Sequence, residues 1–146
     1  MESNIVNKSI EIHATPPAVW QVLTDPDRIK RWMSDDPLEI RCDWTVGGAI
    51  NIRGDMHGYA FTNKGIVLAL EPDKLLRYTY LSSLSKLPDR PQNYSVIDFK
   101  LIANNQGTAL TLTQSNFITL TNYKHFNFYW STTLQIIKRL AEQSGH

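Results

Sequence analysis

The chain has 146 residues, of which 42% are hydrophobic and 20% are charged, and its formal net charge is +1. This composition is ordinary for a globular protein, and it excludes disordered and fibrous classes. So small a net charge gives no electrostatic footprint for nucleic acid or for an anionic membrane surface, so neither partner is expected.

Chain length, cysteine content and the lack of long apolar segments indicate the number of domains and the cellular compartment. A chain of this length normally folds around one core, so residues 1–146 are predicted to form a single domain. The single cysteine, Cys42, cannot form an intrachain disulfide, which suits a reducing compartment. No run approaches the roughly 18 apolar residues of a membrane span, and the N-terminus has no apolar stretch of signal-peptide length. We therefore predict a cytoplasmic protein that does not insert into membranes.

The N-terminal quarter of the chain predicts one strand followed by two short helices. Residues 5–12 place isoleucine and valine on one face, as in a half-buried strand. Helix-start signals follow at 15–17 (TPP) and 24–26 (TDP), because a proline at the first helical position loses no hydrogen bond. Pro26 also stops the first helix from continuing, since the residue before a proline avoids the helical region. Each short helix carries one tryptophan, Trp20 or Trp32.

Residues 38–116 have the pattern of strands separated by turns. Turn signals lie at Gly47-Gly48, around Pro72 and at 104–107. The segments predicted as strands are 38–42, 49–53, 59–61 with a continuation toward Gly65, 66–70, 75–81, 96–102 and 109–113.

Residues 82–93 interrupt this series with two prolines and three serines, and they predict a long loop. One interpretation is a mobile surface connection. The other is a lid or binding loop, because loops of this length often have that role. In the second case Leu84 and Leu87 would dip into the mouth of a cavity.

The C-terminal residues predict one long helix, capped by Thr121 or Asn122. Apolar residues recur there at spacings of three and four, namely Tyr123, Phe126, Trp130, Leu134, Ile137 and Ala141. The predicted order is thus strand, two short helices, about six strands and a long helix. An antiparallel sheet covered on one face by that helix is an α+β arrangement.

Short motifs mark this order of elements along the chain. They are Pro17-x-x-Trp20-x-x-Leu23-Thr24-Asp25-Pro26, Trp32, Gly47-Gly48, Gly65-Ile66-Val67 ahead of Glu71-Pro72 and Leu75, Thr108-Ala109-Leu110-Thr111-Leu112, and Trp130-x-x-x-Leu134. Their order and spacing resemble the START-like superfamily, also called SRPBCC or helix-grip proteins. Within it the chain looks most like the branch named after the C-terminal domain of the heat-shock-protein-90 ATPase activator. The resemblance covers nearly the whole chain.

This resemblance implies a curved antiparallel sheet of six to seven strands around the long C-terminal helix. It also implies a cavity between sheet and helix, closed at one end by the two short helices. Two positions depart from the pattern: Tyr129 stands where many members have glycine, and Gln114 stands near the place where many have histidine. A function tied to that histidine is therefore not carried over to this chain.

Aromatic residues are frequent on the faces that are predicted to point inward. The hydroxyl groups of buried tyrosines need hydrogen-bond partners, which suits a part-polar cavity better than a dry core. The hypothesis is a ligand pocket in which Gln114 or a tyrosine hydroxyl orients the ligand. In the alternative, the aromatic residues are core anchors, as we expect for Trp20. The predicted ligand-binding residues are Trp32, Tyr59, Tyr78, Tyr80, Phe99, Gln114, Phe126 and Trp130.

Three functions fit these features. The first is a small cytosolic START-like protein that binds a hydrophobic or aromatic small molecule in the cavity. The second, implied by the branch resemblance, is a chaperone partner that stimulates the heat-shock-protein-90 ATPase. The third is a cyclase-like enzyme acting in the same cavity, with Tyr78 or Tyr80 as general acid. No catalytic constellation or phosphate-binding glycine loop accompanies these residues, so the sequence favours a binding protein and predicts no cofactor.

A metal site is not predicted either. Asp55 and His57 could supply two ligands, but the sequence places no third ligand beside them, and a surface turn is the favoured interpretation. Cys42 has no helix N-terminus beside it to lower its pKa, so it is expected to be inert.

Overall fold

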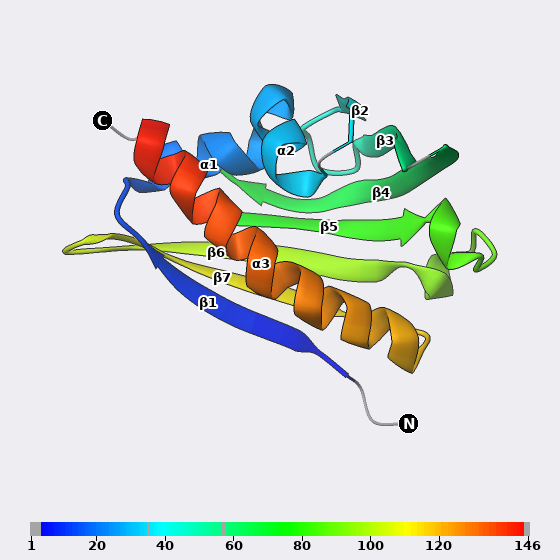
Figure 1. Cartoon of the computed structure of the whole chain (residues 1–146). Coiled ribbons are helices and arrows are strands. Elements are labelled where there is room, and N and C mark those ends of the chain that lie inside the picture. Colours follow the sequence, from blue (N-terminus) through cyan, green and yellow to red (C-terminus); the bar gives the residue numbers. More distant parts are fainter. Residues whose placement is uncertain (1–3, 35, 57, 145–146) are drawn as a thin grey trace.

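The computed structural model describes residues 4–34, 36–56 and 58–144, and it consists of one sheet with its helices on one face (Figure 1). In chain order the elements are β1 (Val6–Ile12), α1 (Pro16–Thr24), α2 (Pro26–Met33), β2 (Leu38–Cys42), β3 (Ala49–Met56), β4 (Tyr59–Glu71), β5 (Leu75–Ser82), η1 (Ser83–Ser85), η2 (Pro91–Asn93), β6 (Ser95–Asn104), β7 (Gly107–Ser115) and α3 (Leu120–Ser144). The α+β arrangement predicted from the sequence is confirmed.

Across the described residues the sheet has seven strands in the order β1-β7-β6-β5-β4-β3-β2, all paired antiparallel. A register shift between Val67 and Ala69 marks a bulge in β4, and bulges bend a strand and increase its twist. At Gly65 a Cβ atom would lie 1.8 Å from the carbonyl oxygen of Thr79, so only glycine allows β4 and β5 to approach so closely there. These features bend and twist the sheet where β4 and β5 meet.

One residue, Asp25, separates the two short helices. Its backbone N–H donates to Gln21 at the end of α1, and its carbonyl oxygen accepts the N–H groups of Arg28 and Ile29 at the start of α2. The hydroxyl oxygen of Thr15 caps α1 by accepting the N–H of Ala18 at 3.4 Å, which agrees with the helix-start signal at 15–17. Pro16 and Pro26 occupy the first positions of α1 and α2, where a proline loses no hydrogen bond. The helix pair therefore follows from the two proline motifs.

Helix α3 lies across the face of the sheet, and α1 and α2 lie beside its C-terminal half (Figure 1). The helix begins at Leu120, earlier than predicted. Its cap is Thr119, whose hydroxyl oxygen accepts the backbone N–H of Asn122 at 3.1 Å, and neither Thr121 nor Asn122 has the predicted capping role. Its stripe of Trp130, Leu134 and Ile137 is buried against the sheet. None of the helices in the described chain is long and apolar enough to cross a lipid bilayer.

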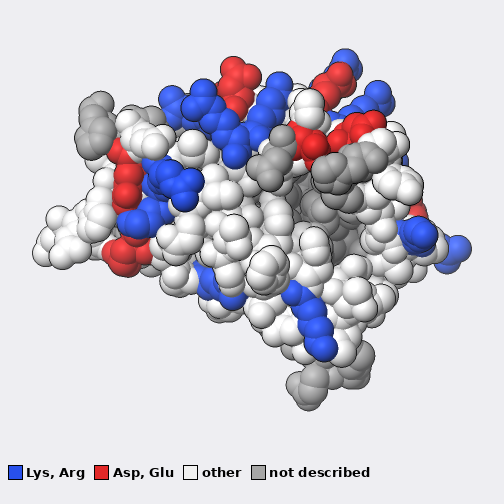
Figure 2. Space-filling view, in the orientation of Figure 1, with Lys and Arg blue, Asp and Glu red and all other residues white. Residues whose placement is uncertain are grey.

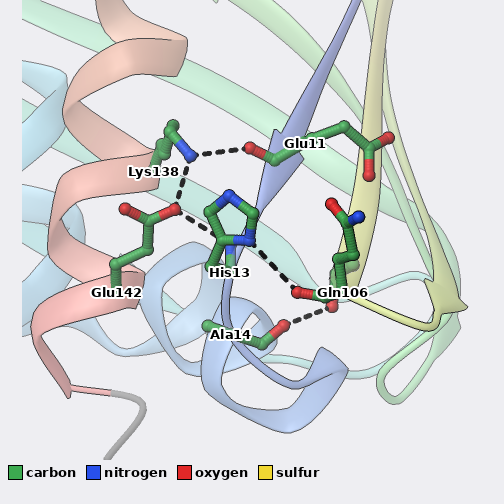
Figure 3. A network of polar contacts seen from close by, with 7 residues as sticks. Glu11, His13, Ala14, Gln106, Lys138 and Glu142 are labelled. Atoms are coloured by element: carbon green, nitrogen blue, oxygen red, sulfur yellow. Dashed lines mark hydrogen bonds and ion pairs between the residues drawn. The ribbon is translucent and has the colours of Figure 1, made fainter.

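A polar network fastens the C-terminal part of α3 to the end of β1 (Figure 3). The ammonium of Lys138 donates to the carbonyl oxygen of Glu11 at 2.9 Å and forms an ion pair with Glu142. The carboxylate of Glu142 also accepts the backbone N–H of His13 at 2.9 Å, and His13 Nδ1 lies 3.3 Å from the carbonyl oxygen of Gln106. The helix is thus held to the sheet by hydrogen bonds at its C-terminal end, as well as by its apolar stripe.

We expect this network to make stability depend on pH. Hydrogen bonds from Lys138 and from the backbone of His13 hold the pKa of Glu142 below its usual range. Its stabilising contribution is therefore complete above the unfolded-state pKa and is lost as the pH falls through the lower folded-state value. At neutral pH Glu142→Gln should cost about 0.5–1 kcal/mol of unfolding free energy, since the pair is partly exposed. Urea unfolding at a series of pH values measures this difference, which should shrink under acid conditions; a constant difference would contradict the assignment.

Candidate functional site

A pocket of about 270 Å³ lies between the sheet and α3. Its walls come from α2, from strands β2 to β6, from η1 and from α3, and most of the side chains are apolar. Ile50 and Ile52 face it from β3, Ile97 from β6, and Phe126 and Trp130 from α3. The volume is close to the lower end of the range for small-molecule sites, roughly 300–1,000 Å³.

Three aromatic side chains in mutual contact form a deeply buried cluster in this region. Trp32 packs against Phe99 with ring centroids 6.4 Å apart and against Trp130 at 6.1 Å, while Phe99 and Trp130 meet edge to face at 5.6 Å. The indole N–H of Trp32 donates to the carbonyl oxygen of Val22 at 2.8 Å, which ties α2 to α1. Trp32 and Trp130 line the pocket, while Phe99 is buried behind them as core. Trp32 and Trp130, for which the sequence left core and pocket wall as alternatives, are both buried and part of the pocket wall.

The fully buried side chain of Gln114 joins β7 to α3 and β6. Its Oε1 accepts the indole N–H of Trp130 at 2.8 Å, and its Nε2 donates to Ser95 Oγ at 3.0 Å. Both ends of this amide are therefore hydrogen bonded within the fold. Gln114 fixes the position of Trp130, and through Trp130 it fixes one wall of the pocket.

Three tyrosines, Tyr78, Tyr80 and Tyr129, line the first pocket. Burial is the main cause that raises the pKa of Tyr80 to about 12, and it raises the pKa values of Tyr78 and Tyr129 as well. The Tyr129 hydroxyl donates to the carbonyl oxygen of Met33 at 3.0 Å, which links α3 to α2 at the pocket. All three phenols stay protonated at neutral pH and present neutral hydroxyl groups to the interior.

A second pocket of about 400 Å³ adjoins the first. Five residues line both pockets: Tyr80, Ser82, Leu84, His125 and Phe126. Tyr80 and Phe126 meet edge to face at 5.6 Å within this shared wall. Gln114 lines the second pocket and not the first.

The segment 82–93, predicted as a loop, covers this second pocket in part. It contains η1 and η2, two single turns of tight helix. Leu84, 43% exposed, lines both pockets, and Leu87 lines the second. The two leucines that were expected at a cavity mouth do lie at the pockets, whereas a lid function of the segment stays a prediction.

A buried polar residue in the wall of the first pocket was not predicted from the sequence. Asn63, in the middle of β4, is 7% exposed and lines the pocket. Its side-chain oxygen has no hydrogen-bond partner among the described residues. Alternation along β4 from Phe61 would have placed Asn63 on the inward face, but the predicted strand was divided near Gly65. Met33, His125 and Tyr129 also line the pocket and were not predicted.

The structure brings most of the predicted site residues together. Trp32, Tyr78, Tyr80, Phe126 and Trp130 line the first pocket. The expectation that Tyr59 points into the cavity is wrong, because its side chain is 73% exposed at the start of β4. Tyr59 lies in the β3–β4 hairpin, paired with Met56, beyond the part of the sheet that the helices cover.

The metal and nucleophile candidates can be placed only in part. The carboxylate of Asp55 accepts the N–H of Gly58 at 2.7 Å, while His57 lies outside the described residues. Within the described ranges no cluster of three or more histidine, cysteine or acidic residues could hold a metal ion. Burial, with a smaller effect from Asp43, raises the pKa of the Cys42 thiol to about 12, so it stays protonated and unreactive at neutral pH.

Charged side chains gather along the edges of the molecule in the view of Figure 2 and leave the middle, over α3, mostly uncharged. Among the described side chains that line the first pocket, Lys64 is the one with a fixed charge, and its ammonium pairs with Asp89 at 3.2 Å on the outside of the sheet. The site is therefore an apolar hollow with neutral polar groups.

Comparison with known proteins finds one matching family model and similar solved structures. The family model described as "Activator of Hsp90 ATPase homolog 1-like protein" matches residues 13–142. The solution structure of ChR145 from Cytophaga hutchinsonii is 33% identical, with a TM-score of 0.82, and the match covers 98% of this chain and 97% of that one. The Aha1 dimer from Colwellia psychrerythraea is 26% identical, with a TM-score of 0.74 and coverages of 94% and 96%. Among curated proteins no relative matches the chain.

Proposed function

The chain belongs to the family of activator of Hsp90 ATPase homolog 1-like proteins, and from the geometry of its pocket we propose that it binds an apolar or aromatic small molecule between the sheet and α3. The observation that supports this most is the hollow of about 270 Å³ walled by aromatic and aliphatic side chains. Small-molecule sites are typically concave, mostly apolar pockets with a few polar groups, and this pocket has that character. A cytosolic location stays a prediction.

Affinity in such a site comes mainly from the apolar surface that ligand and pocket remove from water. Each Å² contributes about 25 cal/mol, before the costs of association are subtracted. Neutral phenols and the absence of an unpaired fixed charge among the described lining residues suit an uncharged ligand. Trp32 and Trp130, whose rings are tilted by 42° to each other, offer ring faces and edges to an aromatic guest.

Leu84 provides a test of whether the mouth of the pocket contributes to binding. We expect Leu84→Ala to weaken the binding of indole by roughly threefold to fivefold, because up to about 1 kcal/mol of burial is lost. Leu68→Ala is the matched control, since Leu68 is also 43% exposed but lies on the outer face of β4. Isothermal titration calorimetry with indole measures both variants. If the two variants bind indole equally, segment 82–93 takes no part in binding.

A second candidate function is stimulation of a chaperone ATPase. The family match over residues 13–142 and the likeness to the Aha1 dimer favour it. Purified Hsp90 would be assayed for ATP hydrolysis with and without this protein. A rise in turnover that persists in a variant with a blocked pocket would make the two functions separable, and no rise would remove this candidate.

A further inference from the structure

Asn63 occupies a place where a bound molecule would meet it. It sits on β4 opposite Ile52 of β3 and Ser82 of β5, and it lines the first pocket. Its side chain is more than nine-tenths buried. An asparagine on the inward face of a central strand is costly unless its polar atoms are satisfied.

The side-chain oxygen of Asn63 is an unused hydrogen-bond acceptor. It is shielded from solvent and has no partner among the described residues. Leaving such a buried group unpaired costs about 1–3 kcal/mol. The terminal torsion of an asparagine is soft, so the amide can turn its oxygen toward a donor that enters the pocket.

The other short polar side chains in the pocket wall are already engaged. Ser34 Oγ accepts the backbone N–H of Asp36 at 3.0 Å. Thr79 Oγ1 accepts the N–H of Ile66 at 2.9 Å. Ser82 Oγ accepts the N–H of Leu84 at 3.2 Å. Each of these hydroxyl oxygens accepts a backbone N–H, whereas Asn63 Oδ1 accepts no hydrogen bond from any described residue.

The charges around the pocket decide which donor fits. An acceptor oxygen repels a carboxylate, and the ammonium of Lys64 is paired with Asp89 and does not neutralise a buried anion. A hydroxyl or N–H group carries the needed proton without a charge to desolvate. The chemistry of the site thus disfavours a fatty-acid headgroup at this position.

We propose that Asn63 Oδ1 accepts a hydrogen bond from a hydroxyl or N–H group of the bound molecule, so that the pocket selects neutral aromatic molecules that carry a donor. This inference rests on the proposed binding function and adds to it the class of ligand. It also assigns to Asn63 the orienting role that the sequence suggested for Gln114 or a tyrosine.

Indole and benzofuran form a matched pair of probes for this proposal, because they share shape and size and differ in one N–H group. Calorimetric titration at neutral pH should show the wild type binding indole roughly tenfold more tightly than benzofuran, as expected for one buried hydrogen bond. Benzofuran carboxylate should bind more weakly than either. This comparison needs no variant.

Asn63→Leu removes the acceptor and keeps the size of the side chain. In this variant the ratio of indole to benzofuran affinity should fall to about one, while benzofuran binds at least as well as to the wild type. A melting curve checks that the variant is folded. In the wild type, the side-chain amide resonance of Asn63 should shift on adding indole and shift less on adding benzofuran.

The outcomes distinguish a failure of the role assigned to Asn63 from a failure of the proposed binding function. If both probes bind the wild type equally, or if Asn63→Leu keeps the preference for indole, the role of Asn63 is wrong and the pocket remains a binding site. If the carboxylate binds best, the ligand class is wrong. If no probe binds, the proposed function fails and this inference fails with it.

Discussion

Replacing Trp32 with alanine is expected to lower the free energy of unfolding by about 3–5 kcal/mol. The side chain is 3% exposed, packs against Phe99 and Trp130, and donates its indole N–H to Val22. The substitution therefore removes a large apolar contact, leaves a carbonyl oxygen of α1 without its partner and loosens α2 from α1. Urea unfolding followed by circular dichroism measures the loss.

Trp32→Phe separates packing from hydrogen bonding in this prediction. Phenylalanine keeps most of the ring contact but cannot donate to Val22, so it should cost about 1–2 kcal/mol. A fall in unfolding free energy of less than about 1 kcal/mol for Trp32→Ala would mean that Trp32 does not connect the short helices to the core.

Filling the pocket is expected to have the largest effect on ligand binding. Ile52 faces the hollow from β3, and Ile52→Trp places an indole ring in the space that a guest would occupy. We expect the affinity for indole to fall by about tenfold or more, because ligand and side chain compete for one volume. Ile52 is also part of the buried core, so a melting curve checks that the larger side chain leaves the variant folded.

Arg53→Trp is the matched control for this variant. Arg53 is the next residue on the same strand, and its side chain is exposed. It adds the same indole ring to the outer surface and should leave binding unchanged. Equal loss of binding in both variants would mean that the effect is not occupation of the pocket.

Much of the fold could be predicted because it depends on local signals. Thr15 and the following prolines fix where α1 begins, and the spacing of Trp130, Leu134 and Ile137 fixes which face of α3 is buried. Such signals depend on backbone sterics and on helical periodicity, both of which a sequence shows directly. The start of α3 was misplaced because Thr119, Thr121 and Asn122 are all good capping residues.

The candidate site was harder to predict, as Tyr59 and Asn63 illustrate. Both occupy the inward parity of β4, together with Phe61. Tyr59 is nevertheless exposed because the hairpin end extends beyond the helices that cover the sheet, which is a tertiary feature. Asn63 was missed because Gly65 suggested a break in a strand that runs on through it.

Gln114 shows a different limit of sequence reasoning. Its inward position was predicted correctly, but its hydrogen bonds to Trp130 and Ser95 depend on which side chains meet across three elements. The same holds for the pocket itself. Whether the sheet and α3 enclose space depends on the fit of many side chains and not on any one motif.

Nuclear Overhauser contacts between bound indole and the methyl groups of the protein would locate the ligand on the structure. Binding between the sheet and α3 should give contacts to Ile52 and Ile97, which reach the pocket from strands β3 and β6. Contacts confined to Ile66 and Leu68, which are exposed on the outer face of β4, would contradict it.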